Sequence, residues 1–139
     1  MRVHRVAERI AHDASLDEVA TLVRGELTAL LGLFDCWIEL PPFTWVLPRL
    51  ERGGTVGSAE HHWLGAGFTL PQDGVELVVL DRGREAARLV LLGDPDVAVT
   101  LEARIVAVAL ADQLGAAVAL ASDADLRRVA VDRAQPDAD

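Results

Sequence analysis

The side chains that could carry out chemistry are few, and their spacing argues against most reactions. His61 and His62 are adjacent, and neighbours on an extended chain point to opposite sides, so this pair cannot share one metal ion. Cys36 is the only cysteine, and its apolar neighbours predict a buried, reduced thiol. No serine stands in a Gly-x-Ser-x-Gly sequence, and no glycine-rich segment has the ending of a phosphate-binding loop. We therefore expect no catalytic residue, no metal and no cofactor.

A second set of residues suits the binding of a small molecule. Acidic and aromatic residues between 35 and 39 alternate with apolar ones, and on a strand this alternation places them together on one face. That face is expected to look toward the long connection over residues 41–74, which supplies further aromatic and polar side chains. The alternative is that the aromatic side chains form a second core layer with the carboxylates at its rim. The candidate ligand-binding residues are Asp35, Trp37, Glu39, His62, Trp63 and Phe68.

Two helices are expected before the first strand. Residues 3–14 carry apolar side chains at helical spacing among charged ones. Ser15 and Glu18 have the spacing of a capping box, and the apolar stripe that follows ends at Gly32, which suits the left-handed residue after a helix. The pattern predicts a short amphipathic helix over 3–14 and a longer helix over 16–31.

Strands are expected in the middle of the chain. One segment alternates strictly until two prolines end it, and two apolar runs joined by a short link with Gly83 predict a hairpin covered on both faces. The connection between them is too long to lack structure, so edge strands are expected inside it. The expected strands are residues 34–40, 46–51, 65–70, 75–81 and 86–92.

A long helix is expected near the C-terminus. Thr100 fits an N-cap for a helix over residues 100–121, and residues 123–131 fit a continuation. The helix is apolar almost all round, so one side can pack on the sheet while the other needs a partner. The residues expected in a homodimer interface are Val106, Leu110, Leu114 and Ala117.

Composition limits the class of protein and its partners. A length of 139 residues suits a single domain, expected over residues 1–133 with a frayed tail at 134–139. The net charge of −9, from 22 acidic and 13 basic residues, would repel nucleic acid and anionic membrane surfaces. The longest apolar segment contains Asp112, which disfavours a membrane span, and the N-terminal residues lack a signal-peptide pattern. We expect a cytoplasmic protein with no nucleic-acid partner and no membrane contact.

Several phrases of the sequence resemble the GAF family of sensory domains. They are Ser-Leu-Asp-Glu-Val at 15–19, Leu-Leu-Gly at 30–32 before Cys-Trp-Ile-Glu-Leu at 36–40, and Glu-Ala-Arg at 102–104 running to Leu-Ala-Asp-Gln-Leu-Gly-Ala-Ala at 110–117. The chain is similar to the GAF-like region of actinobacterial sensor proteins related to the potassium-sensing histidine kinases. An actinobacterial source also agrees with the basic residues, all of which are arginine. The resemblance implies an α+β fold with a GAF-like antiparallel sheet, N- and C-terminal helices packed on one face and loops over the opposite face.

The resemblance also implies a function. It indicates a sensory or regulatory domain that binds a small ligand or a partner and signals through its terminal helices. The alternative is a ligand-free dimerisation or scaffold domain of the same fold. Enzyme activity is not expected, because GAF-like methionine sulfoxide reductases use reactive cysteines and this chain has one cysteine in an apolar run.

Overall fold

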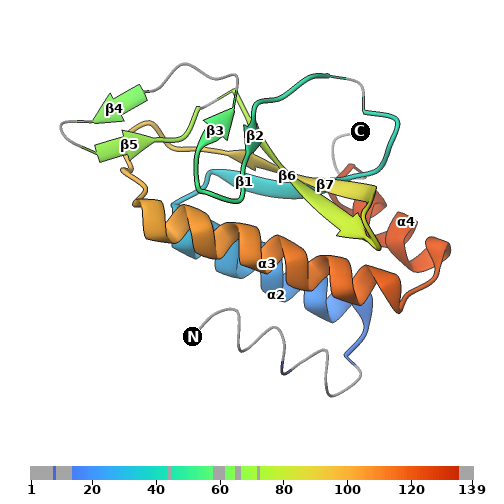
Figure 1. Ribbon diagram of the computed structural model, residues 1–139. Coiled ribbons are helices and arrows are strands. Elements are labelled where there is room, and N and C mark those ends of the chain that lie inside the picture. The colour runs from blue at the N-terminus through green and yellow to red at the C-terminus, as the bar shows by residue number, and fades with distance from the viewer. Residues whose placement is uncertain are drawn as a thin grey trace.

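The computed structural model describes residue 8 and residues 14–43, 45–57, 62–64, 67–71 and 73–134. Within these residues the fold is a mixed α+β arrangement of helices and sheets (Figure 1). The predicted helix at 3–14 lies outside the described residues except for Glu8 and Ala14. The helices are α2 (Leu16–Leu31), α3 (Leu101–Ala119) and α4 (Asp123–Ala134), and the strands are β1 (Asp35–Glu39), β2 (Arg49–Leu50), β3 (Val56–Gly57), β4 (His62–Leu64), β5 (Gly67–Thr69), β6 (Val75–Asp81) and β7 (Arg84–Leu92).

The main sheet has five strands in the order β1-β7-β6-β2-β3. β7 pairs antiparallel with β1 and β6, whereas β2 pairs parallel with β6 through Arg49 and Glu76. The expected antiparallel sheet is therefore correct for β1, β7 and β6 and wrong at β2. Because β1 and β2 run in the same direction, the chain between them has to cross the sheet before β2 begins. We call residues 40–43 and 45–48 the crossover segment.

Local sequence explains where the helices begin and end. Ser15 Oγ accepts a hydrogen bond of 3.2 Å from the amide of Glu18, and Gly32 has φ 62° and ψ 47° after the last turn of α2. Thr100 Oγ1 accepts a bond of 3.0 Å from the amide of Ala103 and so caps α3. These contacts satisfy amides of the first turn, which have no partner within the helix. The predicted helix at 16–31 is confirmed, and the predicted C-terminal helices are confirmed with a break between α3 and α4.

Two helices cover one face of the main sheet. α2 and α3 lie side by side beneath it (Figure 1), with α3 in contact with β6 and β7 and α2 in contact with β1. α4 contacts both α2 and β1. The apolar side chains of these elements form one buried cluster, which includes Leu27, Leu89 and Leu110. None of the helices in the described part of the chain is long and apolar enough to cross a membrane.

Two glycines in the helices test how closely α3 packs on the sheet. A Cβ at Gly115 would collide with the backbone carbonyl of Leu80 in β6, whereas a Cβ at Gly25 in α2 would meet nothing within 4 Å. Gly115→Ala is therefore expected to destabilise the fold by about 1–3 kcal/mol through overpacking. Gly25→Ala is expected to stabilise it by about 0.5–1 kcal/mol through helix propensity. Urea denaturation of both variants checks this pair, and a shift of both midpoints in the same direction would contradict it.

Candidate functional site

The alternation of β1 separates a core face from a face turned away from α2 and α3. Cys36 and Ile38 are buried in the apolar core, while Asp35, Trp37 and Glu39 are half-buried on the opposite side. The predicted sharing of one face by these three residues is confirmed. They do not act alike, however, because Asp35 Oδ1 accepts a hydrogen bond of 2.8 Å from the amide of Cys36.

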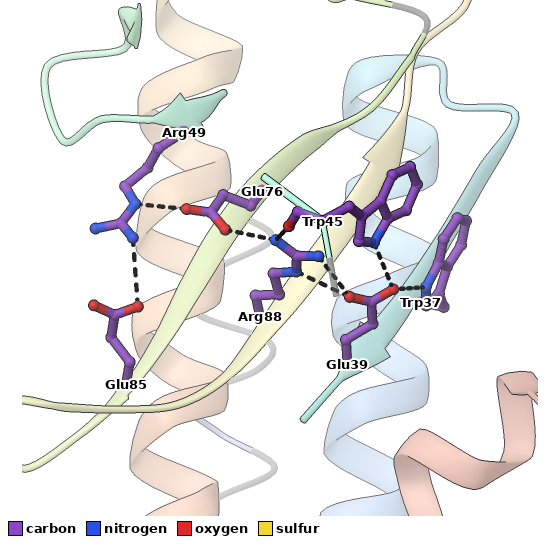
Figure 2. A network of polar contacts seen from close by, with 7 residues as sticks. All are labelled: Trp37, Glu39, Trp45, Arg49, Glu76, Glu85 and Arg88. Atoms are coloured by element: carbon purple, nitrogen blue, oxygen red, sulfur yellow. Dashed lines mark hydrogen bonds and ion pairs between the residues drawn. The ribbon is translucent and has the colours of Figure 1, made fainter. Parts of the chain in front are cut away.

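A buried arginine lies at the centre of that face. Arg88, on the central strand β7, has only 1% of its surface exposed. Its Nε and Nη2 atoms donate to Glu39 Oε1 at 3.0 and 2.7 Å, and Nη1 donates to Glu76 Oε1 at 3.1 Å (Figure 2). Sheet register explains these contacts, since Glu39 lies directly opposite Arg88 on β1 and Glu76 lies diagonally across on β6. A buried guanidinium is tolerated only with such charged partners.

The crossover segment is fastened to the same arginine. Arg88 Nη1 donates to the backbone carbonyl of Trp45 at 3.1 Å, and the guanidinium carbon lies 4.4 Å from the centre of the Phe43 ring. A cation held over an aromatic face is attracted by the ring quadrupole. The segment therefore covers the sheet where it crosses it, and Arg88 holds it in place from below.

Further hydrogen bonds extend this network to both sides. Glu39 Oε2 accepts from the indole Nε1 of Trp37 at 3.1 Å and of Trp45 at 3.3 Å. On the other side, Glu76 Oε2 accepts from Arg49 Nε at 2.8 Å. Figure 2 shows the network running from Trp37 to Arg49 in front of the strands, with the helices behind them. Each carboxylate oxygen of Glu39 and Glu76 thus has at least one donor from this chain.

These donors change the acidity of Glu39. Burial alone raises the pKa of this carboxyl, but hydrogen bonds from Arg88, Trp37 and Trp45, together with the charge of Arg88, outweigh burial and hold the pKa below its ordinary value. Glu39 is therefore ionised at neutral pH. Arg88 and Glu39 form a true ion pair, with the indoles completing the coordination of the carboxylate.

Of the predicted ligand-binding residues beyond β1, only Phe68 has a side chain that the structure describes. The Phe68 ring lies 4.3 Å from the guanidinium of Arg104 on α3, and its backbone carbonyl accepts a bond of 2.7 Å from Val99. This placement corrects the predicted grouping of Phe68 with Trp37 and Glu39. His62 and Trp63 are on β4, and their side chains lie outside the described part of the structure.

Three of the four residues predicted for a dimer interface are buried within the chain. Leu110 and Leu114 have no exposed surface, Ala117 is buried, and Val106 is half-buried. The sequence pattern could not distinguish the sides, because α3 is apolar almost all round. The large apolar residues that α3 exposes are Leu101 and Ile105 instead.

Cys36 is buried, as predicted. Burial raises the pKa of its thiol to about 12, although the nearby Arg24 charge acts in the opposite direction. The thiolate is the reactive form of cysteine, so the thiol is inert at neutral pH. Among the described residues, no group of three or more histidine, cysteine, aspartate or glutamate side chains is arranged to hold a metal ion.

The sequence interpretation missed Arg88, Glu76 and Arg49. Glu76 and Arg88 stand inside the two apolar runs whose mostly apolar faces predict a hairpin covered on both sides. Their charges were the available signal, because opposite charges on facing strands of one hairpin can pair diagonally. Arg49 carried no comparable signal, since its parallel pairing with Glu76 depends on the path of the crossover segment.

Comparisons of this chain with protein-family models, with curated proteins and with solved structures give no match. Function is therefore inferred from the geometry of the chain itself.

Proposed function

We propose that this chain is a cytoplasmic regulatory domain of the GAF-like type. A small ligand or a partner binds at the crossover segment, and the terminal helices transmit the response. The observation that supports this proposal most directly is that two hydrogen bonds of the segment end on one ion pair, Arg88 and Glu39.

This convergence makes the segment suitable as a switch element. Trp45 contributes both hydrogen bonds, through its carbonyl to Arg88 and its indole to Glu39. Trp45 is nonetheless 41% exposed and Val46 is 99% exposed, so a binding partner can reach them. A molecule that binds the Trp45 side chain competes with the hydrogen bonds that hold the segment. The segment then has two arrangements, held and released, and such a molecule binds the released one more tightly.

The path from the site to the helices is short. Glu39 is the last residue of β1, and β1 is in contact with both α2 and α4. A displacement of the crossover segment would act on Glu39 first, and through β1 on the helices that pack against it. Bistable packed elements of this kind can carry coupling between sites.

The hydrogen bonds that Glu39 already accepts restrict which ligands can bind at its carboxylate. Both carboxylate oxygens already accept hydrogen bonds from this chain. A ligand at this carboxylate must therefore bring its own donor to replace the indole N–H of Trp45, since an abandoned acceptor in a half-buried site is costly.

A thermal-shift screen with nucleotides, haem, amino acids and potassium salts tests the proposal. A compound that binds the folded state raises the melting temperature by mass action, with about 2.7 kcal/mol of stabilisation at a hundred times its Kd. The rise is expected to disappear in Glu39→Gln and to persist in Asp112→Asn, which alters an exposed ion pair with Arg52 outside the network. A rise that survives Glu39→Gln would place the ligand elsewhere and contradict the proposal.

One observation favours the alternative of a ligand-free scaffold. The network is closed within the chain, because Arg88 has two carboxylates, a carbonyl and an aromatic ring as partners. A site whose hydrogen bonds are complete without a ligand can have a single role, which is to hold the crossover segment in place. The absence of any thermal shift in the screen, with an unaltered melting transition, would favour this second function.

A further inference from the structure

We infer that the outer edge of β6 binds an extended segment of a partner polypeptide by strand addition. On one side β6 pairs with β7 along its whole length, but on the other side β2 meets it only where Arg49 pairs with Glu76. The amide of Glu76 donates to the carbonyl of Pro48 at 2.8 Å, which marks the side to which this residue turns its backbone groups. β6 continues for five more residues beyond that bridge, through Asp81.

The backbone groups of Val78 are the main evidence. Alternate residues of a strand turn their N–H and C=O groups to the same neighbour, so Val78 faces the side that β2 occupies at Glu76. In the described chain no strand pairs with Val78 on that side. Two residues farther on, the carbonyl of Leu80 lies against Gly115 of α3, after a register shift between Val79 and Leu80. The open edge is therefore short and centred on Val78.

A cleft lies beside this edge. β2 leaves β6 after Leu50, and the chain beyond it is held over α3 by an ion pair of 3.0 Å between Arg52 and Asp112. The divergence leaves a cleft of about 150 Å³ whose apolar lining consists of Leu50, Leu77, Val78, Leu80 and Val108. Small-molecule pockets have volumes of about 300 Å³ or more. This cleft is too small for such a ligand and suits a single aliphatic side chain.

The edge of the sheet at β1 is protected at Cys36, in contrast to β6. On β1, the amide of Cys36 donates to Asp35 Oδ1 at 2.8 Å, and its carbonyl accepts from Arg24 Nε at 2.9 Å. Side chains that occupy edge backbone groups prevent pairing with another chain. No such contact covers Val78 among the described residues, and Leu80 beside it is an exposed leucine.

The space available determines the occupant. If a second copy of this chain paired antiparallel so that its Leu80 lay opposite Val78, its Arg82 would lie opposite Glu76, which β2 already occupies. A free segment can instead end or bend before β2. Main-chain hydrogen bonds would bind it and one aliphatic side chain would enter the cleft, as in other cases of strand addition. The net charge of −9 favours a segment with basic rather than acidic flanks.

A labelled peptide tests this inference on the intact chain. The probe is a fluorescein-labelled peptide of alternating leucine and threonine with a lysine at each end, followed by fluorescence anisotropy. We expect saturable binding below about 1 mM, and slower amide exchange at Val78 in the bound state. The same peptide with N-methyl groups on alternate residues lacks the donors and is expected not to bind. Equal binding of both peptides, or no binding of the first, would overturn the proposal.

Two variants locate the site. Leu80→Lys is expected to weaken peptide binding by about tenfold or more, because it puts a charge at the mouth of the cleft. Ile105→Lys, at an exposed apolar residue that does not line the cleft, is expected to leave binding unchanged. Equal effects of the two substitutions would argue against the cleft.

Amide exchange in the unliganded protein tests the premise without any variant. The amide of Val78 is expected to exchange faster than those of Leu77 and Val79, which face β7. Exchange at Val78 as slow as at its neighbours would show that the edge is closed. Exchange that slows with rising protein concentration would indicate a second copy as the occupant and would equally overturn the proposal.

Discussion

Replacement of Arg88 with methionine is expected to lower the free energy of unfolding by about 3–5 kcal/mol at neutral pH. Methionine keeps much of the apolar length of the side chain but leaves Glu39 and Glu76 without their shared cation. Glu76 has only 8% of its side chain exposed, so water cannot replace the lost guanidinium. The variant also loses the hydrogen bond to the carbonyl of Trp45 and the contact with the Phe43 ring. Urea denaturation measures the change.

Arg49→Met provides the matched control for Arg88→Met. Arg49 has 42% of its side chain exposed and pairs with the same Glu76, which would keep Arg88 as a partner. Its loss is expected to cost about 1 kcal/mol or less, as for a surface ion pair. Similar losses in the two variants would contradict the central role assigned to Arg88. Adding Glu39→Gln to Arg88→Met should recover part of the stability, because it removes the charge that has lost its cation.

The same pair sets an acid dependence of stability. The folded pKa of Glu39 lies below its unfolded value, so the pair stabilises the fold fully above the unfolded value of about 4.3 and loses this contribution as pH falls through the folded pKa. In Arg88→Met the Glu39 carboxyl loses its cation, which raises its pKa. Acidification to about pH 5 should then stabilise the variant relative to pH 7. Denaturation at both pH values distinguishes the two directions.

Leu110→Arg is expected to destabilise the chain by more than about 4 kcal/mol, which is enough to unfold many single domains. Leu110 has no exposed surface and belongs to the cluster between α3 and the sheet. An arginine there would place a charge in the core without a partner. Ile105→Arg, on the same helix but 44% exposed, is expected to change stability by about 1 kcal/mol or less.

Circular dichroism and urea denaturation compare these two helix variants. A folded Leu110→Arg protein with near-normal stability would show that this side of α3 does not face the core. That result would favour the interface at Leu110, Leu114 and Ala117 that the sequence predicts.

Local patterns of the sequence were sufficient to predict most elements of the fold. The cap at Ser15, the left-handed Gly32 and the strict alternation around Cys36 all act within a few residues, and the structure confirms the helix and strand that they predict. Strands are also present inside the long connection over 41–74, as expected, although β2 covers only Arg49–Leu50 of the predicted 46–51. Strand ends depend on pairing with distant residues, which a local pattern does not contain.

Only the β1 side of the candidate site could be predicted from the sequence. Parity on β1 correctly grouped Trp37 with Glu39, but the partner of Glu39 is Arg88, which is 49 residues later in the chain. Its position opposite Glu39 depends on the register between β1 and β7. The sequence likewise could not predict which side of α3 faces the sheet, because a helix that is apolar all round has no hydrophobic stripe to orient it.

The protection of Cys36 on β1 has a consequence for how molecules of this protein can associate through their strands. Fibrils grow when each molecule offers two open strand edges, one for the molecule ahead and one for the molecule behind. With the Cys36 amide and carbonyl held by Asp35 and Arg24, and with α4 in contact with β1, strand-mediated growth from β6 of one molecule cannot continue at Cys36 on β1 of the next. Filaments built by repeated pairing of β6 with β1 are therefore not expected.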